Sequence, residues 1–249
     1  MDQRIIVHNS PKSPDAEAYR TIRSNIQFSS TDREIKSLLI TSSGQEEGKS
    51  LTCVNLAVAF AAAESKVLLM DADLRKPNLH KIMKIDKKDG LTNILSKHND
   101  YKGFISKTEV PNLDVLLCGP VPPNPSEMLS SKSMKSLMEQ VRNAYDIVII
   151  DTPPVGIVTD AQILSTLVDG VILVVASEKA KVESVRKAKE LLQNVNSNIL
   201  GVILNKVKKK SNYYYAYDEE TGEKMKTKNK IKKSLPIEAL KMAKRKLEH

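Results

Sequence analysis

Three short segments of this 249-residue chain carry residue types that can hold and transfer phosphate groups. The first is Ser43-Gly-Gln-Glu-Glu-Gly-Lys-Ser50, which follows an apolar stretch ending at Ile40 and precedes a helical pattern. Backbone N–H groups at the beginning of a helix can surround a polyphosphate. Lys49 would neutralise its β and γ phosphates, and the Ser50 hydroxyl would ligate Mg²⁺, which prefers oxygen. The segment predicts a nucleotide site; a capped turn between a strand and a helix is the alternative.

The other two segments place carboxylates after apolar runs. Asp71 and Asp73 follow residues 67–70, and Asp151 follows residues 147–150. Side chains two positions apart in extended backbone point to the same side, and open α/β sheets bind ligands at the carboxyl ends of their strands. One carboxylate could help to hold Mg²⁺ while another accepts a proton from an attacking hydroxyl group. Aspartates often end strands or cap turns, so the prediction depends on the three segments together.

Apolar runs and helical periodicity alternate along the chain around these segments. Strands are predicted at residues 37–41, 67–70, 113–117, 147–150, 171–175 and 199–204. Helices are predicted at residues 14–28, 50–64, 78–83, 126–144, 160–167 and 181–195, and residues 1–13 are expected to be extended. Continuous apolar strands separated by helices predict an α/β fold in which helices cover both faces of a parallel sheet.

The positive charge of the chain is concentrated at its C-terminal end. Residues 206–249 contain 14 Lys and Arg against 6 Asp and Glu, whereas the preceding residues contain 25 against 24. Such a basic tail suggests an anionic partner, which could be a membrane surface, a nucleic acid or an acidic protein; a solvated tail is the alternative. No apolar run approaches the ~20 residues of a membrane span. With no signal-peptide pattern at the N-terminus, we expect a cytoplasmic protein.

The three phosphate-site segments, in this order, resemble the deviant-Walker group of P-loop ATPases. Within that group the chain is similar to the bacterial tyrosine kinases of capsule and exopolysaccharide synthesis, over about residues 14–207. The matching motifs are Walker A at 43–50, Walker A′ with its paired aspartates at 67–77, and Walker B at 148–151. Further shared segments are 72–77, 119–129, 151–154 and 160–162. Partition and septum-site ATPases usually carry a lysine early in Walker A, where this chain has Gly44.

The resemblance implies an ATP- and Mg²⁺-dependent protein-tyrosine kinase of the non-specific type, built on a P-loop NTPase fold. The implied catalytic residues are Lys49, Asp71, Asp73 and Asp151, and the implied Mg²⁺ ligands are Ser50, Asp73 and Asp151. The implied ATP-binding residues are Ser43, Gly44, Gln45, Glu46, Glu47, Gly48, Lys49, Ser50, Leu51 and Asn205. Asp71 is the expected base, although Asp71 and Asp73 could exchange roles. Arg75 would stabilise phosphate charge or bind an activator, and Asn205 would read the adenine edge unless it only ends a strand.

Two further patterns match the same family. The tail carries a cluster that such kinases phosphorylate between subunits: Tyr213, Tyr214, Tyr215 and Tyr217. An aromatic stacking or membrane-interface patch is the alternative for this cluster. Glu17, Arg20 and Arg23 match an E-x-x-R-x-x-R pattern near one helix face, and the resemblance implies that this helix joins subunits in a ring. A solvated helix face is the alternative for these three residues.

The resemblance also implies a division of the chain and a set of partners. Residues 1–30 would form an N-terminal extension with an oligomerisation helix, 31–207 the kinase domain, and 208–249 the basic tail with its tyrosine cluster. The chain resembles the Gram-positive cytoplasmic type, in which a separate transmembrane activator recruits the kinase to the inner face of the plasma membrane. A cognate tyrosine phosphatase and exogenous protein substrates are the other expected partners, and no nucleic acid is required.

Two positions depart from the family pattern. Glu46 stands where glycine is common, and Leu51 where threonine often follows. A glutamate at a position that needs positive φ would add strain and negative charge near phosphate, unless its side chain points to solvent. One alternative function is a partition- or septum-type ATPase switch that binds membrane or DNA, which the basic tail favours. The other is a non-catalytic nucleotide-binding adaptor, which Glu46 favours.

Overall fold

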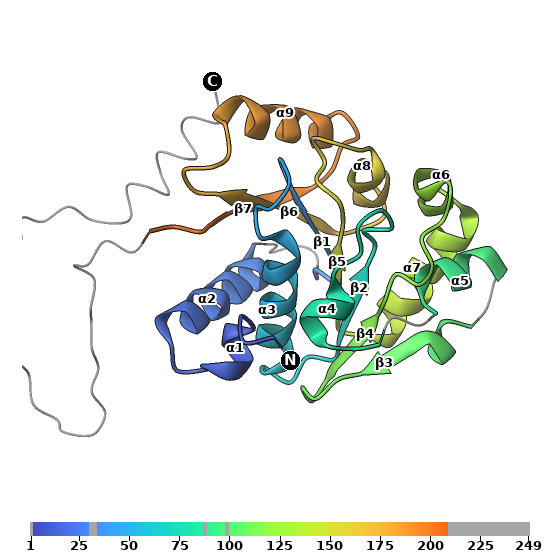
Figure 1. Cartoon of the computed structure of the whole chain (residues 1–249), viewed down its shortest axis with the longest axis horizontal. Helices are drawn as coiled ribbons and strands as arrows, with labels where there is room; N and C mark the ends of the chain where they lie inside the picture. The colour runs from blue at the N-terminus through green and yellow to red at the C-terminus, as the bar shows by residue number, and fades with distance from the viewer. Residues whose placement is uncertain (1, 30–33, 87–88, 98–99, 209–249) are drawn as a thin grey trace, which may run out of the picture. The chain divides into compact units, whose positions relative to one another are not determined.

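A seven-stranded sheet forms the centre of the computed structural model, which describes residues 2–29, 34–86, 89–97 and 100–208. The strand order is β3-β4-β2-β5-β1-β6-β7, and all neighbours are parallel except β3 and β4. The strands are β1 (Ser37–Ser42), β2 (Val67–Asp71), β3 (Ile105–Lys107), β4 (Leu113–Leu116), β5 (Ile147–Asp151), β6 (Gly170–Ala176) and β7 (Ile199–Asn205). The predicted α/β class is confirmed (Figure 1).

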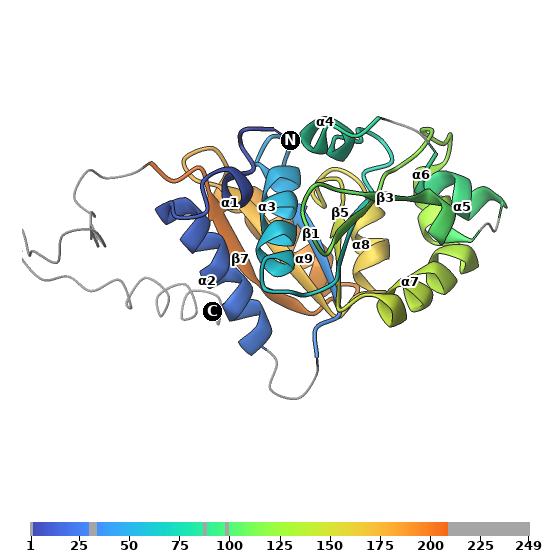
Figure 2. The same cartoon turned by 90° about the horizontal axis from the view of Figure 1, so that it is seen from below.

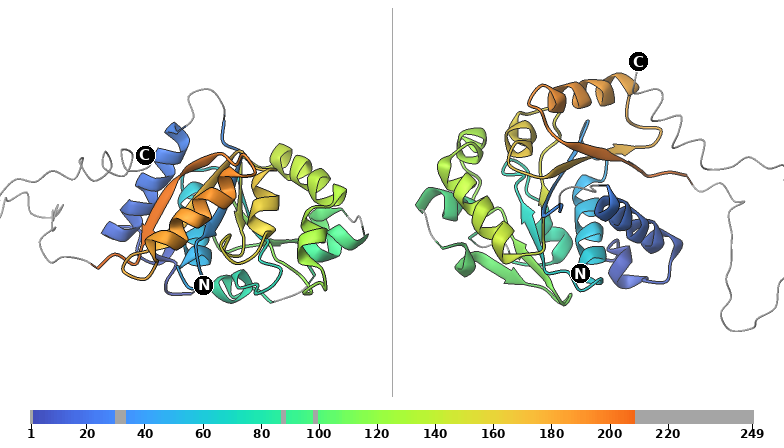
Figure 3. Two further views of the ribbon diagram at one scale, coloured as in Figure 1. Left: turned by 90° about the horizontal axis from the view of Figure 1, so that it is seen from above. Right: turned by 180° about the vertical axis from the view of Figure 1, so that it is seen from behind.

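Helices cover both faces of this sheet (Figures 1 and 2). The helices are α1 (Ile6–Asn9), α2 (Pro14–Phe28), α3 (Lys49–Ala61), α4 (Leu79–Met83), α5 (Leu91–Lys97), α6 (Pro125–Leu129), α7 (Lys132–Ala144), α8 (Asp160–Ser165) and α9 (Val182–Gln193). A 3-10 turn at Tyr101–Phe104 leads into β3. Figure 3 shows from behind that α2 and α3 lie across the sheet from α9.

The strands supply two hydrophobic cores because successive side chains point to opposite faces. In β1, Leu38 and Ile40 join the core under α1–α4, whereas Leu39 joins the core under α5–α9. All six residues of β1 are buried. Burial on both faces explains why the central strands are continuously apolar in sequence.

The structure corrects three local predictions. The segment 126–144 is not one helix, because Ser131 separates α6 from α7 and caps α7, its hydroxyl accepting a hydrogen bond from the Met134 N–H at 3.2 Å. Residues 1–13 are not all extended, since α1 forms with the Val7 N–H donating to Asn55 Oδ1 at 3.1 Å. The antiparallel strand β3 was not predicted, because Ile105-Ser-Lys107 is short and mostly polar.

Candidate active site

The phosphate loop joins β1 to α3 and is held by its own side chains. Gly48 has φ +90°, and a Cβ added there would lie 2.1 Å from the side-chain nitrogen of Asn205, so only glycine fits. The buried Glu47 carboxylate folds back on Ser43, accepting from its N–H at 3.1 Å and its hydroxyl at 2.7 Å. Glu47 and Ser43 therefore shape the loop through the N–H and the hydroxyl of the serine.

Lys49 lies at the beginning of α3 and faces a group of carboxylates. Its Nζ is 2.6 Å from Asp151 Oδ1 and 3.8 Å from Asp73 Oδ2, and it also donates to the Ser50 hydroxyl at 3.3 Å. The lysine side chain is only 8% exposed. Burial is the largest single influence and opposes its charge, but the Asp151 carboxylate, Cys53 and Asp73 together outweigh burial and raise the pKa of Lys49. The lysine thus keeps its positive charge at the point where a phosphate would bind.

Asp71 and Asp151 lie side by side because β2 and β5 are paired in register at these two residues. Both residues are fully buried. Burial and the nearby Asp151 charge raise the pKa of Asp71 to about 8. The Asp71 carboxylate accepts hydrogen bonds from the N–H groups of Asp73 at 3.3 Å and Leu79 at 3.2 Å. Asp71 is therefore held in place and keeps its proton at neutral pH, so it can accept a proton only as the pH approaches 8.

The same carboxylates have the chemistry of a magnesium site that also uses substrate phosphates. Among the described residues, no group of three or more His, Cys, Asp or Glu side chains is arranged to hold a metal ion by itself. Asp151 Oδ2, however, is buried without a hydrogen-bond partner, and the Ser50 hydroxyl lies at the same lysine as Asp151 and Asp73. Mg²⁺ is usually held by one or two carboxylates together with phosphates and waters. The three expected ligands therefore fit such an ion.

Arg75 does not belong to the lysine group. Its guanidinium donates to both oxygens of Asp160, at 2.9 and 3.0 Å, and to the Ser126 hydroxyl at 2.9 Å. Ser126 in turn donates to Asp160 at 2.8 Å, and Asp160 is fully buried at the beginning of α8. Arg75 thus ties the loop after β2 to α6 and α8, a connection that the sequence analysis did not foresee.

Asn205 and Glu46 lie at the outer side of the phosphate loop. The Asn205 amide donates to the Glu47 carbonyl at 2.9 Å and accepts from the Lys206 N–H at 2.8 Å, so its polar atoms support the loop. Glu46 has φ +59° and an 81% exposed side chain that pairs with Lys179. Its carboxylate points to solvent rather than into the phosphate position. Leu51, the other departure from the family pattern, packs against the hydrophobic core.

The three residues of the expected oligomerisation pattern do not share one environment. Glu17 and Arg20 form an ion pair of 2.6 Å on the outer side of α2, where their side chains are 66% and 33% exposed. Arg23 instead donates to the Ala59 carbonyl of α3 at 2.9 Å. The tyrosine cluster at 213–217 lies outside the described residues.

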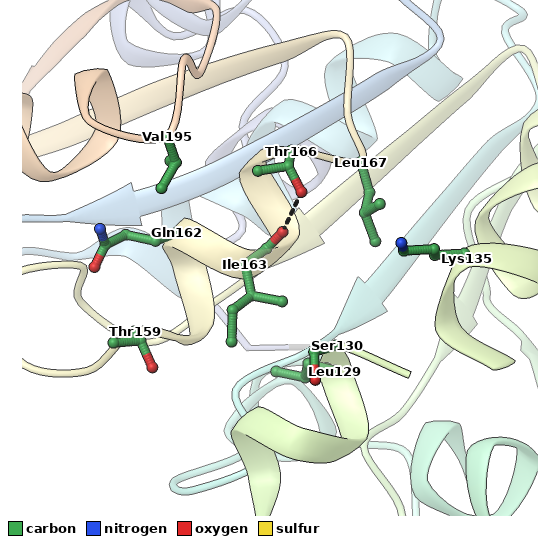
Figure 4. A pocket seen from close by; sticks show the side chains of 9 residues that line it. All are labelled: Leu129, Ser130, Lys135, Thr159, Gln162, Ile163, Thr166, Leu167 and Val195. Carbon is green, nitrogen blue, oxygen red and sulfur yellow. Dashed lines mark hydrogen bonds between the residues drawn. The ribbon is translucent and has the colours of Figure 1, made fainter. Parts of the chain in front are cut away.

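A surface pocket of about 440 Å³ lies between α6, α7 and α8, apart from the phosphate loop. Figure 4 shows Gln162 and Ile163 of α8, with Thr166 directly after this helix, on one side and Lys135 of α7 on the other. None of its lining residues belongs to the Lys49 group. We therefore place the chemistry at the loop and its carboxylates, where charged side chains converge.

Comparison with known proteins agrees with this geometry. The family model described as "ParA: NUBPL iron-transfer P-loop NTPase" matches residues 34–246. Tyrosine-protein kinase YwqD of Bacillus subtilis is 48% identical over 217 residues, which cover 86% of this chain and 92% of that protein. The putative tyrosine-protein kinase CapB of Staphylococcus aureus is 44% identical, covering 87% of this chain and 96% of its own. This chain belongs to the bacterial tyrosine-protein kinases.

Solved structures separate this family from the septum-site ATPases. The chimerical protein CapA2B2 superposes with a TM-score of 0.80 at 44% identity, covering 84% of this chain and 92% of that one. The kinase domain of the Escherichia coli tyrosine kinase ETK gives a TM-score of 0.80 at 32% identity, covering 86% and 84%. The septum site-determining protein MinD of Pyrococcus horikoshii, complexed with Mg-ADP, reaches only 0.59 at 25% identity, covering 68% and 69%. The septum-type likeness is therefore the more distant one.

The family assignment identifies the class of reaction, whereas the roles of individual residues depend on the geometry of the site. A tyrosine-protein kinase with a P-loop NTPase fold binds a nucleotide and phosphorylates protein tyrosine. The relatives that this chain matches at 43–48% identity are named as tyrosine-protein kinases. No helix among the described residues is long and apolar enough to cross a membrane.

Proposed function

We propose that this tyrosine-protein kinase binds ATP with Mg²⁺ and transfers the γ-phosphoryl group to its own tail cluster, Tyr213, Tyr214, Tyr215 and Tyr217, between subunits. The observation that carries the proposal is the position of the buried Lys49 ammonium, 2.6 Å from Asp151 and beside the phosphate loop. Regulation of capsular or exopolysaccharide synthesis is the physiological role that follows from the family.

Lys49 and the N–H groups of the loop would stabilise the charge of the phosphoryl group in transfer. Such preorganised donors act strongly in a dry site and need no rearrangement during the reaction. Ser50, Asp73 and Asp151 would hold Mg²⁺, which neutralises phosphate charge when it is bound. The fixed backbone contacts of Glu47 and Asn205 keep the loop in place for this task.

Asp71 is our proposed acceptor of the tyrosine hydroxyl proton. Its pKa of about 8, raised by burial and by Asp151, suits a group that takes up a proton during the reaction. Asp73 is more accessible, with a side chain that is 12% exposed, and its Oδ1 accepts from the Lys76 N–H at 3.0 Å. Asp71→Asn should therefore lower the transfer rate more than Asp73→Asn; the reverse order would assign the proton acceptor to Asp73.

The proposal extends to assembly and partners. Residues 1–30 would contribute the oligomerisation helix, with Glu17 and Arg20 facing a neighbouring subunit, and residues 31–207 the kinase domain, while 208–249 carry the substrate tyrosines. A separate transmembrane activator would bring the chain to the inner face of the membrane, and a cognate phosphatase would reverse the reaction. The exposure of the Glu17–Arg20 pair supports the first point, and family resemblance supports the others.

A complementation experiment tests transfer between subunits directly. One full-length variant carries Lys49→Met with all tyrosines intact, and the other carries four Tyr→Phe changes with an intact site. Each alone should give no phosphotyrosine in the tail after incubation with ATP and Mg²⁺, whereas the mixture should label the tail of the Lys49→Met chain, as read by mass spectrometry. ATP hydrolysis without phosphotyrosine in the wild type would contradict the kinase and favour an ATPase switch. Labelling of wild type but not of the mixture would contradict transfer between subunits.

A further inference from the structure

Glu46 occupies a backbone conformation that usually requires glycine. Its φ is +59°, within the left-handed region, where a side chain strains the backbone. The residue lies two positions before Gly48 in the phosphate loop, so its conformation sets the direction of the loop's N–H groups. Because the residue type does not favour this conformation, contacts that hold Glu46 would offset the strain.

Two lysines from distant parts of the chain contact Glu46. Lys179, in the turn between β6 and α9, pairs with its carboxylate at 2.8 Å. Lys206, which directly follows β7, donates to its backbone carbonyl at 2.6 Å. The hydrogen bond from Lys179 also holds the pKa of Glu46 below its ordinary value. One lysine thus fixes the side chain and the other fixes the backbone of the same residue.

The turn and the strand end that carry these lysines are themselves joined. The Ser177 N–H donates to the Asn205 carbonyl at 2.7 Å, and Asn205 donates to the carbonyl of Glu47 at 2.9 Å. A second ion pair, Lys208 with Glu178 at 2.5 Å, lies in the same region but does not reach the loop. The two lysines at Glu46 therefore add to a set of hydrogen bonds between these segments and the loop, and Lys208 offers a matched control.

We propose that Lys179 and Lys206 are positioning residues that hold Glu46 in its left-handed conformation and so keep the phosphate loop ready for the nucleotide. Glycine would adopt this positive φ without strain, whereas Glu46 is held there by its contacts with the two lysines. The inference rests on the proposed function, since it concerns the affinity of that site for ATP. The two lysines act through Glu46, and the proposal does not change the roles of Lys49 and the aspartates.

A double-mutant cycle in the full-length chain tests this coupling. Binding of a fluorescent ATP analogue is measured with Mg²⁺ for Lys179→Ala, Lys206→Ala and the control Lys208→Ala, each with Glu46 and with Glu46→Gly. With Glu46 present, each of the first two changes should raise the Kd about two- to fivefold, as expected for exposed charged contacts, and Lys208→Ala should leave it unchanged. In the Glu46→Gly background the Lys179 effect should vanish and the Lys206 effect should shrink, because glycine needs no support at positive φ.

Three further readouts separate positioning from a general loss of structure. The KM for ATP in autophosphorylation should rise in parallel with Kd while kcat stays within about twofold. Lys179→Arg should restore wild-type binding, and the difference between wild type and Lys179→Ala should shrink at high salt, because exposed pairs are screened. Undiminished effects in the Glu46→Gly background, or no effect of either lysine while wild type binds ATP, would overturn the inference. A wild-type chain that binds no ATP would instead overturn the proposed function.

Discussion

Two lysine–carboxylate pairs on either side of the phosphate loop have nearly the same length and opposite surroundings. Lys49 lies 2.6 Å from Asp151, with side chains 8% and 0% exposed. Lys179 lies 2.8 Å from Glu46, with side chains 48% and 81% exposed. The inner pair sits among other buried carboxylates, whereas water surrounds the outer pair.

Burial, rather than distance, decides what each pair can do. Removing one partner of a buried pair leaves a charge without solvent, which is strongly destabilising, whereas an exposed charge is simply hydrated. Ligands would also compete with the contact inside the inner pair. A phosphate group would attract Lys49, and a metal ion would attract Asp151. The outer pair can only adjust the conformation of the loop that carries it.

Breaking each pair by a neutral isostere gives the largest contrast. Asp151→Asn should slow phosphoryl transfer by about 10²–10³-fold, because Lys49 loses its charged partner in a dry site, as would a Mg²⁺ ion if one binds there. It should also lower the free energy of unfolding by about 3 kcal/mol, since Lys49 stays buried with Asp73 at 3.8 Å as its remaining partner. Glu46→Gln, the matched change in the exposed pair, should leave the free energy of unfolding and the transfer rate at saturating ATP close to wild type.

Phosphotyrosine formation and urea denaturation of the two variants check this contrast. Equal losses in Asp151→Asn and Glu46→Gln would show that burial does not distinguish the pairs. If Asp151→Asn is as stable as wild type but forms no phosphotyrosine, the inner pair serves catalysis alone, which would contradict its predicted role in stability.

The pH dependence of stability sharpens the view of the inner group. Asp71 has a folded pKa of about 8, above the ordinary value of about 3.9 for an unfolded chain. Between these values the folded protein keeps a proton that the unfolded chain releases, so stability should fall as pH rises, by up to about 1.4 kcal/mol per pH unit. Asp71→Asn should remove this slope and be more stable than wild type near pH 8.

Denaturation midpoints of both proteins in EDTA, across pH 5 to 9, measure the slope. EDTA keeps metal ions from competing with the proton for the carboxylates. An identical slope in the two proteins would mean that Asp71 is not the group that retains the proton. The raised pKa also predicts that transfer by the wild type increases with pH toward 8, because only the deprotonated carboxylate accepts the tyrosine proton.

The sequence predicted the parts of this site that depend on local order along the chain. The loop at 43–50 and the aspartates that end β2 and β5 follow from apolar runs and polar ends, which the parallel sheet brings to one edge. Contacts between distant segments could not be foreseen in this way. Arg75 with Asp160 and Lys179 with Glu46 are separated by 85 and 133 positions, and no periodicity relates them.

The spacing of residues along the sequence also did not predict the surroundings of each side chain. Glu17, Arg20 and Arg23 recur at intervals that place them near one face of α2, yet Arg23 turns toward α3 while the other two face solvent. Long side chains can reach around a helix, so a shared spacing does not ensure a shared partner. Likewise, the sequence contains a glutamate at position 46, but it does not show that the carboxylate is exposed to solvent and pairs with Lys179.

The two arginines of α2 provide the smallest test of the same contrast. Arg23→Ala should lower the free energy of unfolding by about 1 kcal/mol, because it removes the hydrogen bond to the Ala59 carbonyl that joins α2 to α3. Arg20→Ala removes the ion pair with Glu17, which contributes about 0.3–0.5 kcal/mol as an exposed pair one turn apart, and an exposed hydrogen bond to the Pro11 carbonyl, so its total cost should stay below that of Arg23→Ala. Light scattering of the same proteins then separates folding from assembly. If Glu17 and Arg20 face a neighbouring subunit, Arg20→Ala should reduce the oligomer while the fold remains intact. A larger loss of stability in Arg20→Ala than in Arg23→Ala would show that the exposed side of α2 supports the fold itself, and the distinction between buried and exposed charges would then fail for this helix.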